Sequence, residues 1–166
     1  MPGPLHPADC TIIIRMETPE FKTVGIVGAG AMGRGIAQIA AQAGSKVLLF
    51  DTQADAVAKA RESVAAQWDK LVEKGRIDAA AATAQKERLQ PAATLADLAP
   101  CDLIVEAIVE RLDVKKGLFA ELEGIVQPTA VLATNTSSLS VTAIAAGLKR
   151  PQQFAGFHFF NPVPLM

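Results

Sequence analysis

The segment TVGIVGAGAMG, residues 23–33, sets a β-branched run directly before three glycines and an alanine-rich stretch. Glycines at this spacing, between a strand and the first turn of a helix, are typical of a turn that receives the pyrophosphate of a dinucleotide. The first glycine allows the tight turn, the second leaves room for the phosphates, and the third lets the helix pack closely on the strand. The helix N-terminus adds N–H donors and a partial positive charge. We expect the dinucleotide to be held by Gly28, Ala29, Gly30, Ala31, Met32 and Gly33.

Asp51 stands at the end of the next β-branched run, about 20 residues beyond the glycines. A carboxylate in this position can accept hydrogen bonds from the adenosine ribose and would repel a 2′-phosphate. Because Thr52 and Gln53 follow it and no arginine is close, we expect the cofactor to be NAD rather than NADP. The alternative for Asp51 is a solvated side chain at a strand end without a ligand.

Outward from this unit, short β-branched runs alternate with longer segments rich in Ala, Leu, Lys and Glu. The pattern predicts an α/β fold, a Rossmann-type doubly wound parallel sheet with helices on both faces. The expected strands cover residues 23–27, 46–50, 103–107, 131–133 and 154–157, with a weaker strand near Leu89. The expected helices cover residues 31–43, 55–74, 114–126 and 141–148, and the polar, alanine-rich insertion 77–86 is expected to form one or two helical turns at the surface.

The length of 166 residues suits one domain with its own core. Residues 1–20 contain four prolines and no helix or strand period, and we expect a flexible arm there, with the dinucleotide-binding domain in residues 21–166. The segment 12–14 is expected to lie outside the sheet.

Composition excludes several partner classes. The chain has 16 Lys and Arg against 17 Asp and Glu, and it lacks Tyr, so a nucleic-acid partner is not expected. No stretch approaches the length of a transmembrane helix, and we expect no membrane partner. Cys10 and Cys101 are far apart and no histidine cluster accompanies them, so we expect neither a metal site nor a disulfide framework, and a cytoplasmic protein.

Three further segments carry a family resemblance. They are VEAIVE at residues 105–110, NTSSLS at 135–140 and HFFNPVP at 158–164. Together with the glycine turn, in this order and at these spacings, they resemble the 3-hydroxyacyl-CoA dehydrogenase family over residues 21–166. The HFFNP part is the most specific of these segments.

The same segments can be interpreted from the residues alone. Glu106, Asn135 and His158 fall at or just after the expected strand ends, where the ligand crevice of a parallel sheet lies. For Asn135 and Ser137, capping or turn formation is the alternative to a site role. For His158, whose neighbours are aromatic, the alternative is a satisfied histidine in the core.

The resemblance implies a role for each of these positions. It implies that His158 takes the proton of a secondary alcohol, as neutral imidazole can near neutral pH. It implies that Ser137 binds the substrate oxygen and the cofactor, and that Asn161 lies near the nicotinamide. Glu110 and Lys115 would contact the cofactor.

A contact of Lys74 with the phosphates of CoA is also implied. On the residues alone, Glu110 could instead pair with Arg111 or Lys115 on an exposed face, and Lys74 could simply be solvated. Trp68, at helical spacing from apolar neighbours, is expected to pack in the core or against another domain.

The activity implied by the resemblance is NAD-dependent oxidation of (S)-3-hydroxyacyl-CoA to 3-oxoacyl-CoA, a step of fatty-acid β-oxidation. Members of the family continue into a glutamate partner for the histidine and a helical second domain, which forms much of the acyl-CoA pocket and the homodimer interface. We therefore expect the isolated chain to bind NAD but to turn over poorly or not at all. The alternatives are a non-catalytic dinucleotide-binding module or remnant, and a relative that acts on free hydroxy acids.

Overall fold

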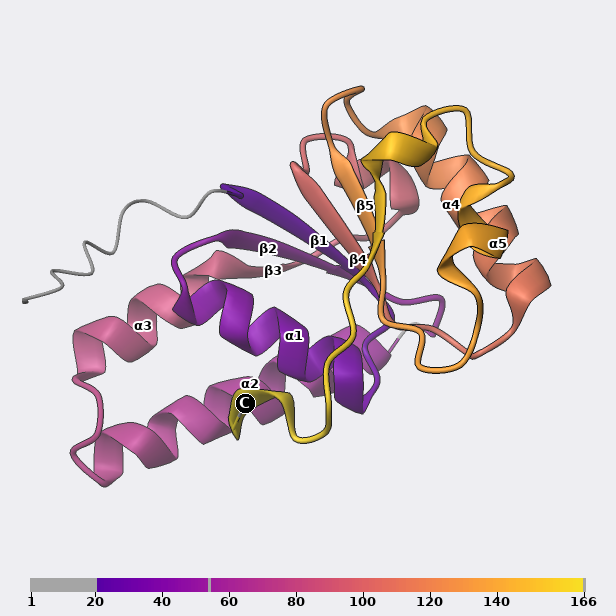
Figure 1. Cartoon of the computed structure of the whole chain (residues 1–166). Coiled ribbons are helices and arrows are strands. Elements are labelled where there is room, and N and C mark those ends of the chain that lie inside the picture. The colour runs from indigo at the N-terminus through magenta and orange to yellow at the C-terminus, as the bar shows by residue number, and fades with distance from the viewer. Residues whose placement is uncertain (1–20, 54, 166) are drawn as a thin grey trace, which may run out of the picture.

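The structure is a computed structural model that describes residues 21–53 and 55–165. It contains one six-stranded parallel sheet with the strand order β3-β2-β1-β4-β5-β6 (Figure 1). The strands are β1 (Thr23–Val27), β2 (Lys46–Phe50), β3 (Leu89–Pro91), β4 (Leu103–Glu106), β5 (Val131–Thr134) and β6 (Phe154–Gly156). This order is that of the Rossmann fold, and it confirms the predicted fold class, including the weaker strand near Leu89.

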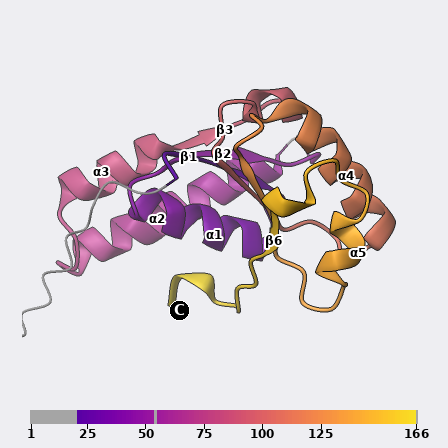
Figure 2. The same cartoon turned by 45° about the horizontal axis from the view of Figure 1, so that its top comes forward.

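Helices cover both faces of the sheet (Figures 1 and 2). The helices are α1 (Ala31–Gln42), α2 (Ala56–Glu73), α3 (Ala79–Arg88), α4 (Leu112–Ile125) and α5 (Val141–Ala145), with the short 3-10 turns η1 (Leu95–Leu98), η2 (Pro151–Gln153) and η3 (Val163–Leu165). The first core cluster joins α1, α2 and α3 to one face, and the second joins α4, α5 and η1 to the other. Because strand side chains alternate, neighbouring residues of one strand enter different clusters.

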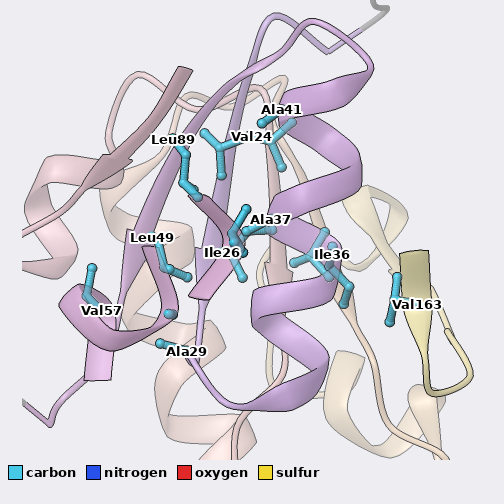
Figure 3. Packing of buried hydrophobic residues seen from close by; sticks show 14 of the residues in the cluster. Val24, Ile26, Ala29, Ile36, Ala37, Ala41, Leu49, Val57, Leu89 and Val163 are labelled. Atoms are coloured by element: carbon cyan, nitrogen blue, oxygen red, sulfur yellow. The ribbon is translucent and has the colours of Figure 1, made fainter. Parts of the chain in front are cut away.

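The helix α1 lies directly on the centre of the sheet (Figure 3). Its buried residues Ile36, Ala37 and Ala41 belong to the same cluster as Val24 and Ile26 of β1. Small side chains on this face let the helix approach the strand closely. The first turn of α1 is thereby fixed relative to the carboxyl end of β1.

Trp68 confirms the expectation of a core position. Its side chain is buried on α2, on the face that also buries Val57, Ala60 and Val64. The spacing of three or four residues puts these side chains on one stripe of the helix.

The insertion after α2 is more regular than expected. The structure has a ten-residue helix, α3, where one or two turns were predicted, so that prediction was too short. The Asp78 side chain caps this helix by accepting a hydrogen bond from the Ala81 amide at 2.6 Å. Ala82 is buried against the neighbouring elements, and this packing adds the stability that the polar sequence alone does not suggest.

Several boundaries differ from the predictions by a few residues. α4 begins at Leu112 rather than 114, and α5 ends at Ala145 rather than 148. After α5 the Leu148 amide donates to the Ala145 carbonyl at 2.9 Å, three residues back, so the chain tightens into a turn instead of continuing the helix. β4 ends at Glu106, one residue before the expected end, and β6 ends at Gly156. The expectations for residues 1–20 concern a part of the chain outside the described residues.

No helix in residues 21–53 and 55–165 is both long enough and apolar enough to cross a membrane.

The close approach of α1 to β1 depends on Gly33. A Cβ at this position would lie 1.8 Å from the Gly28 carbonyl oxygen, which belongs to the backbone and cannot rotate away. Replacing Gly33 by Ala should therefore lower the free energy of unfolding by about 2 kcal/mol or more. Urea unfolding followed by the fluorescence of Trp68, the single tryptophan of the chain, measures this loss.

Gly30 provides the matched control, because a Cβ there meets nothing within 4 Å. Gly30→Ala should change the free energy of unfolding by no more than about 1 kcal/mol, the usual range for a helix N-cap. Equal losses for the two variants would contradict the packing argument.

Candidate functional site

The glycine turn between β1 and α1 is built as the sequence predicts. Gly28 has a φ of +105°, a conformation that other residues rarely adopt. Its amide donates to the Phe50 carbonyl at 2.8 Å, which ties the turn to the end of β2. Gly30 is exposed and its α-carbon faces open space, so the backbone here can be approached by a ligand. The turn therefore fits the pyrophosphate of a dinucleotide.

Asp51 is attached to this turn. Its Oδ2 accepts a hydrogen bond from the Ala29 amide at 2.7 Å, and its Oδ1 accepts one from the Gln53 amide at 2.8 Å. The carboxylate thus lies at the glycine turn, half-buried, where it also helps to hold the loop. This second task is not visible in the sequence. Its contact with the ribose stays a prediction.

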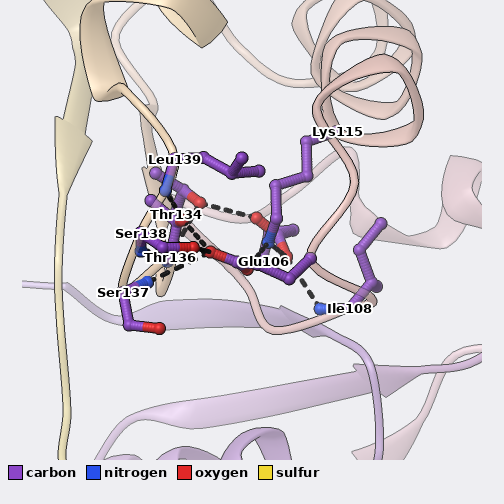
Figure 4. Close-up of polar contacts among 9 residues, drawn as sticks. Glu106, Ile108, Lys115, Thr134, Thr136, Ser137, Ser138 and Leu139 are labelled. Atoms are coloured by element: carbon purple, nitrogen blue, oxygen red, sulfur yellow. Dashed lines mark hydrogen bonds and ion pairs between the residues drawn. The ribbon is translucent and has the colours of Figure 1, made fainter.

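Glu106 is a buried carboxylate under the site. It ends β4 and pairs in register with Thr134, the last residue of β5. Its Oε2 accepts from the Thr134 hydroxyl at 2.7 Å, and its Oε1 accepts from the Ile108 amide at 2.7 Å (Figure 4). Oε1 also accepts from Nζ of Lys115 at 2.5 Å. A fully buried charge is stable only when paired in this way.

Lys115 joins two carboxylates. Its side chain is only 1% exposed, and besides Glu106 its Nζ lies 3.2 Å from Oε2 of Glu110. The alternative of a Glu110–Lys115 pair on an exposed face was therefore wrong about the face, because the lysine is buried. Arg111 pairs with Asp113 instead, at 2.7 Å. The predicted contact of Lys115 with the cofactor stays a prediction.

Glu110 holds the turn that contains Ser137. One carboxylate oxygen accepts hydrogen bonds from the Thr136 hydroxyl, from the Ser137 amide at 3.2 Å and from the Ser138 amide at 3.3 Å (Figure 4). Burial raises the pKa of Glu110, but the Thr136 hydroxyl and the Lys115 ammonium outweigh it and lower the pKa to about 2. Glu110 is thus ionised throughout the neutral range. The part played by Thr134 and Thr136 was missed at the sequence level.

Asn135 directly follows β5 and binds the segment that follows β6. Its Oδ1 accepts a hydrogen bond from the Phe159 amide at 2.8 Å, and the Phe157 amide donates to the Thr134 carbonyl at 2.9 Å. The segment that carries His158 is therefore held at the carboxyl end of β5, near the Ser137 turn. This bond joins residues 24 positions apart in the chain, so it is neither the cap nor the turn that was the alternative for Asn135.

His158 is exposed to solvent, so the alternative of a satisfied core histidine was wrong. Its ring packs edge-on against Phe160, with the centroids 4.6 Å apart. Two of the neighbouring aromatic side chains are also exposed, Phe157 by 44% and Phe160 by 61%. An exposed imidazole on a fixed backbone is available to a ligand.

Two further predicted residues, Asn161 and Lys74, are both exposed. Asn161 is exposed and follows the His158 segment directly. Lys74 is exposed just after α2, and within the described residues no hydrogen bond or ion pair joins it to the rest of the site. Among the described histidines, cysteines and acids, no group of three or more could hold a metal ion.

These observations define the class of the protein. A parallel sheet in this order, with a glycine turn after β1 and a carboxylate after β2, is a dinucleotide-binding domain of the Rossmann type. Residues 23–166 match the family described as "3-hydroxyacyl-CoA dehydrogenase, NAD binding domain", and the chain belongs to this family. NAD is the cofactor of such domains.

Similar proteins carry consistent names. The chain is 46% identical to a 3-hydroxyadipyl-CoA dehydrogenase of Escherichia coli over 87% of its own length and 30% of the relative's. It is 43% identical to a 3-hydroxybutyryl-CoA dehydrogenase of Bradyrhizobium diazoefficiens, over 88% of the chain and 50% of the relative. The crystal structure of a 3-hydroxybutyryl-CoA dehydrogenase from Escherichia coli superposes with a TM-score of 0.87 at 44% identity, covering 89% of this chain and 31% of that one. The chain thus spans half or less of the length of these relatives.

Replacing Glu110 by Gln should change how stability depends on pH. The folded pKa of Glu110 lies below its ordinary value of 4.5, so the carboxylate stabilises the fold fully above pH 4.5. This contribution is lost as the pH falls toward 2. The difference in unfolding free energy between wild type and Glu110→Gln should stay constant between about pH 7 and 5 and shrink below that range, as measured by urea unfolding.

Glu121→Gln is the control, because Glu121 is an exposed carboxylate on α4. Its profile should follow that of the wild type. A Glu110→Gln difference that stays constant down to about pH 3 would show that the charge of Glu110 does not hold the Ser137 turn.

Proposed function

We propose that this chain is the NAD-binding part of an NAD-dependent 3-hydroxyacyl-CoA dehydrogenase, which oxidises (S)-3-hydroxyacyl-CoA to 3-oxoacyl-CoA. The observation that carries the proposal lies at the carboxyl end of β5. There Asn135 accepts a hydrogen bond from the Phe159 amide and so holds the segment with the exposed His158, beside the turn that Glu110 holds at Ser137. A base and a hydrogen-bond donor are thereby presented at the same edge of the sheet as the glycine turn. The names of the relatives support a CoA thioester as the substrate.

The reaction needs two transfers from one hydroxyl-bearing carbon. His158 takes the hydroxyl proton as general base, and the Ser137 hydroxyl donates a hydrogen bond to the same oxygen. The glycine turn and Asp51 would hold NAD, which would supply the acceptor for the hydride of the carbon that becomes a ketone. The chain's own share is to orient the reacting groups and to exclude water, which lowers the barrier by fixing the geometry.

The charged groups that position Ser137 lie beneath the carboxyl ends of β4 and β5. Glu106 and Lys115 form the buried layer, and Glu110 connects it to the Ser137 turn. We propose that Glu110 and Lys115 contribute to cofactor binding from this place and that Asn161 lies beside the nicotinamide. The family resemblance supports both assignments.

We also propose that Lys74 meets the phosphates of CoA. Its exposed position after α2 leaves its ammonium accessible to an anion. Two further assignments rest on the resemblance and on composition, namely homodimerisation of the complete protein and a cytoplasmic location. The buried free thiol of Cys101 fits a reducing compartment.

The choice of cofactor tests the first part of the proposal. In a fluorescence titration of the chain, NADH should bind at least about tenfold more tightly than NADPH, because Asp51 repels a 2′-phosphate. Asp51→Asn should narrow this preference, since the amide keeps a hydrogen-bond acceptor but lacks the charge. Asp55→Asn, which removes an exposed carboxylate four residues further on, should leave the preference unchanged.

A clear preference for NADPH would contradict the role given to Asp51. If Asp51→Asn weakened the binding of both cofactors equally, the carboxylate would act only through its hydrogen bond to Ala29.

Catalysis tests the second part. Reduction of acetoacetyl-CoA by NADH should be slow for the isolated chain, and His158→Gln should lower whatever rate remains by about a hundredfold or more, the usual contribution of a general acid or base. NADH affinity should stay at the wild-type value in this variant. Free acetoacetate should not replace the thioester. Faster reduction of the free acid would favour the alternative of an enzyme for free hydroxy acids, and a His158→Gln variant with undiminished activity would remove the histidine from the mechanism.

A further inference from the structure

A cavity of about 280 Å³ lies beside the candidate site, between α1, α2 and the segment that follows His158. One face of α1 forms its floor, through residues spaced three or four apart. Its polar lining residues are Arg34, Gln38, Gln67 and Asn161. No acidic side chain lines it, so Arg34 gives the cavity a positive charge.

The far wall of the cavity is fixed by close packing. Val163 is 1% exposed and lies on the outer side of α1, next to Ile36 (Figure 3). A Cβ at Gly35 would come within 2.8 Å of the Val163 Cβ, so the wall touches the helix backbone. The arrangement of Asn161, Pro162 and Val163 along the opening is therefore fixed by the helix.

Arg34 does not hold the described part of the fold together by any polar contact. Its guanidinium makes no ion pair or hydrogen bond with any residue in the described part of the chain, although the residue is only half exposed. A guanidinium offers five N–H donors in a planar fork that matches an oxyanion. A partly desolvated cation without a counter-ion is costly to keep, unless a ligand supplies the negative charge.

Gln38 gives a second and independent indication. The residue is 3% exposed, and the small exposed part lines the cavity. Within residues 21–53 and 55–165 no hydrogen bond involves its amide, and the amide atoms are not among the fully buried unpartnered ones, so they are reached from the cavity. An apolar residue would fill this helix position more favourably if packing were its only role. The amide thus faces the cavity with unused donor and acceptor groups.

We propose that this cavity binds an oxyanion of the substrate, with Arg34 as the charged partner and Gln38 as the neutral one. The inference rests on the proposed function, because the acyl-CoA is the molecule that would bring the oxyanion to this side of Asn161. Two parts of such a substrate carry the required chemistry. One is a phosphate of CoA, and the other is a distal carboxylate on a dicarboxylic acyl chain.

The test uses the full chain saturated with NADH and follows the Nε–H signal of Arg34 by NMR, assigned with Arg34→Gln. CoA should shift this signal saturably. Arg34→Gln should weaken CoA binding by roughly tenfold to a hundredfold, the loss expected for a charge-assisted hydrogen bond. Arg111→Gln is the matched control, because the Arg111 guanidinium is exposed, pairs with Asp113 and does not line the cavity, and this variant should bind CoA like the wild type.

Two comparisons identify the source of the oxyanion. Pantetheine lacks phosphates, so a shift with CoA but not with pantetheine assigns the phosphate. If adipyl-CoA binds about tenfold more tightly than butyryl-CoA and Arg34→Gln removes the difference, the distal carboxylate is the partner. Either result supports the proposal.

An Arg34 signal that none of these probes moves, or an Arg34→Gln variant with wild-type affinity, would overturn it. Failure of the proposed function is a separate result, because it would appear as the absence of NADH-dependent shifts in the amides of Gly28 and Gly30. Shifts in these amides without any shift at Arg34 leave the cofactor site intact and remove only the oxyanion site.

Discussion

The buried ion pair between Glu106 and Lys115 is the interaction on which the arrangement of the site depends. Its carboxylate ends β4, its ammonium comes from α4, and at 2.5 Å the two charges fasten the helix to the sheet. Removing one partner from such a pair typically costs about 3–5 kcal/mol, because the remaining charge stays buried. The same ammonium also reaches Glu110, and Glu110 in turn holds the amides of the Ser137 turn. Two ion pairs thus connect the carboxyl end of β4 to the turn of the exposed Ser137.

The sequence was sufficient for the fold and for the glycine turn, because both depend on local patterns. Alternating strands and helices leave few arrangements for a parallel sheet, and the order β3-β2-β1-β4-β5-β6 is among them. The turn needs glycine at Gly28 and Gly33 for reasons that act within a few residues, a positive φ and a close approach. Boundaries were less accurate where tertiary packing decides them, as in α3, whose polar sequence becomes a full helix against its neighbours.

The charge network could not be predicted, because it depends on which face of a strand each residue occupies and on register between strands. Glu106 and Thr134 face each other only because β4 and β5 pair with this register. Lys115 has the sequence context of a surface lysine on an amphipathic helix, and only the helix position against the sheet buries it. The resemblance to a family selected Glu110 and Lys115 as residues of interest, but the contacts that make them a unit come from the structure.

The helix α1 lies between the glycine turn and the segment that follows His158, and it contacts both closely. On one side Gly33 allows contact with the turn after β1, and on the other side Gly35 allows contact with Val163. A larger residue at either position would move the helix away from the glycine turn or from the segment that continues from His158 and Asn161. The distance between the glycine turn and the segment that follows His158 is therefore set by the width of α1 at Gly33 and Gly35. This explains why α1 contains Gly33 and Gly35 although glycine weakens a helix, while Arg34 and Gln38 of the same helix line the cavity.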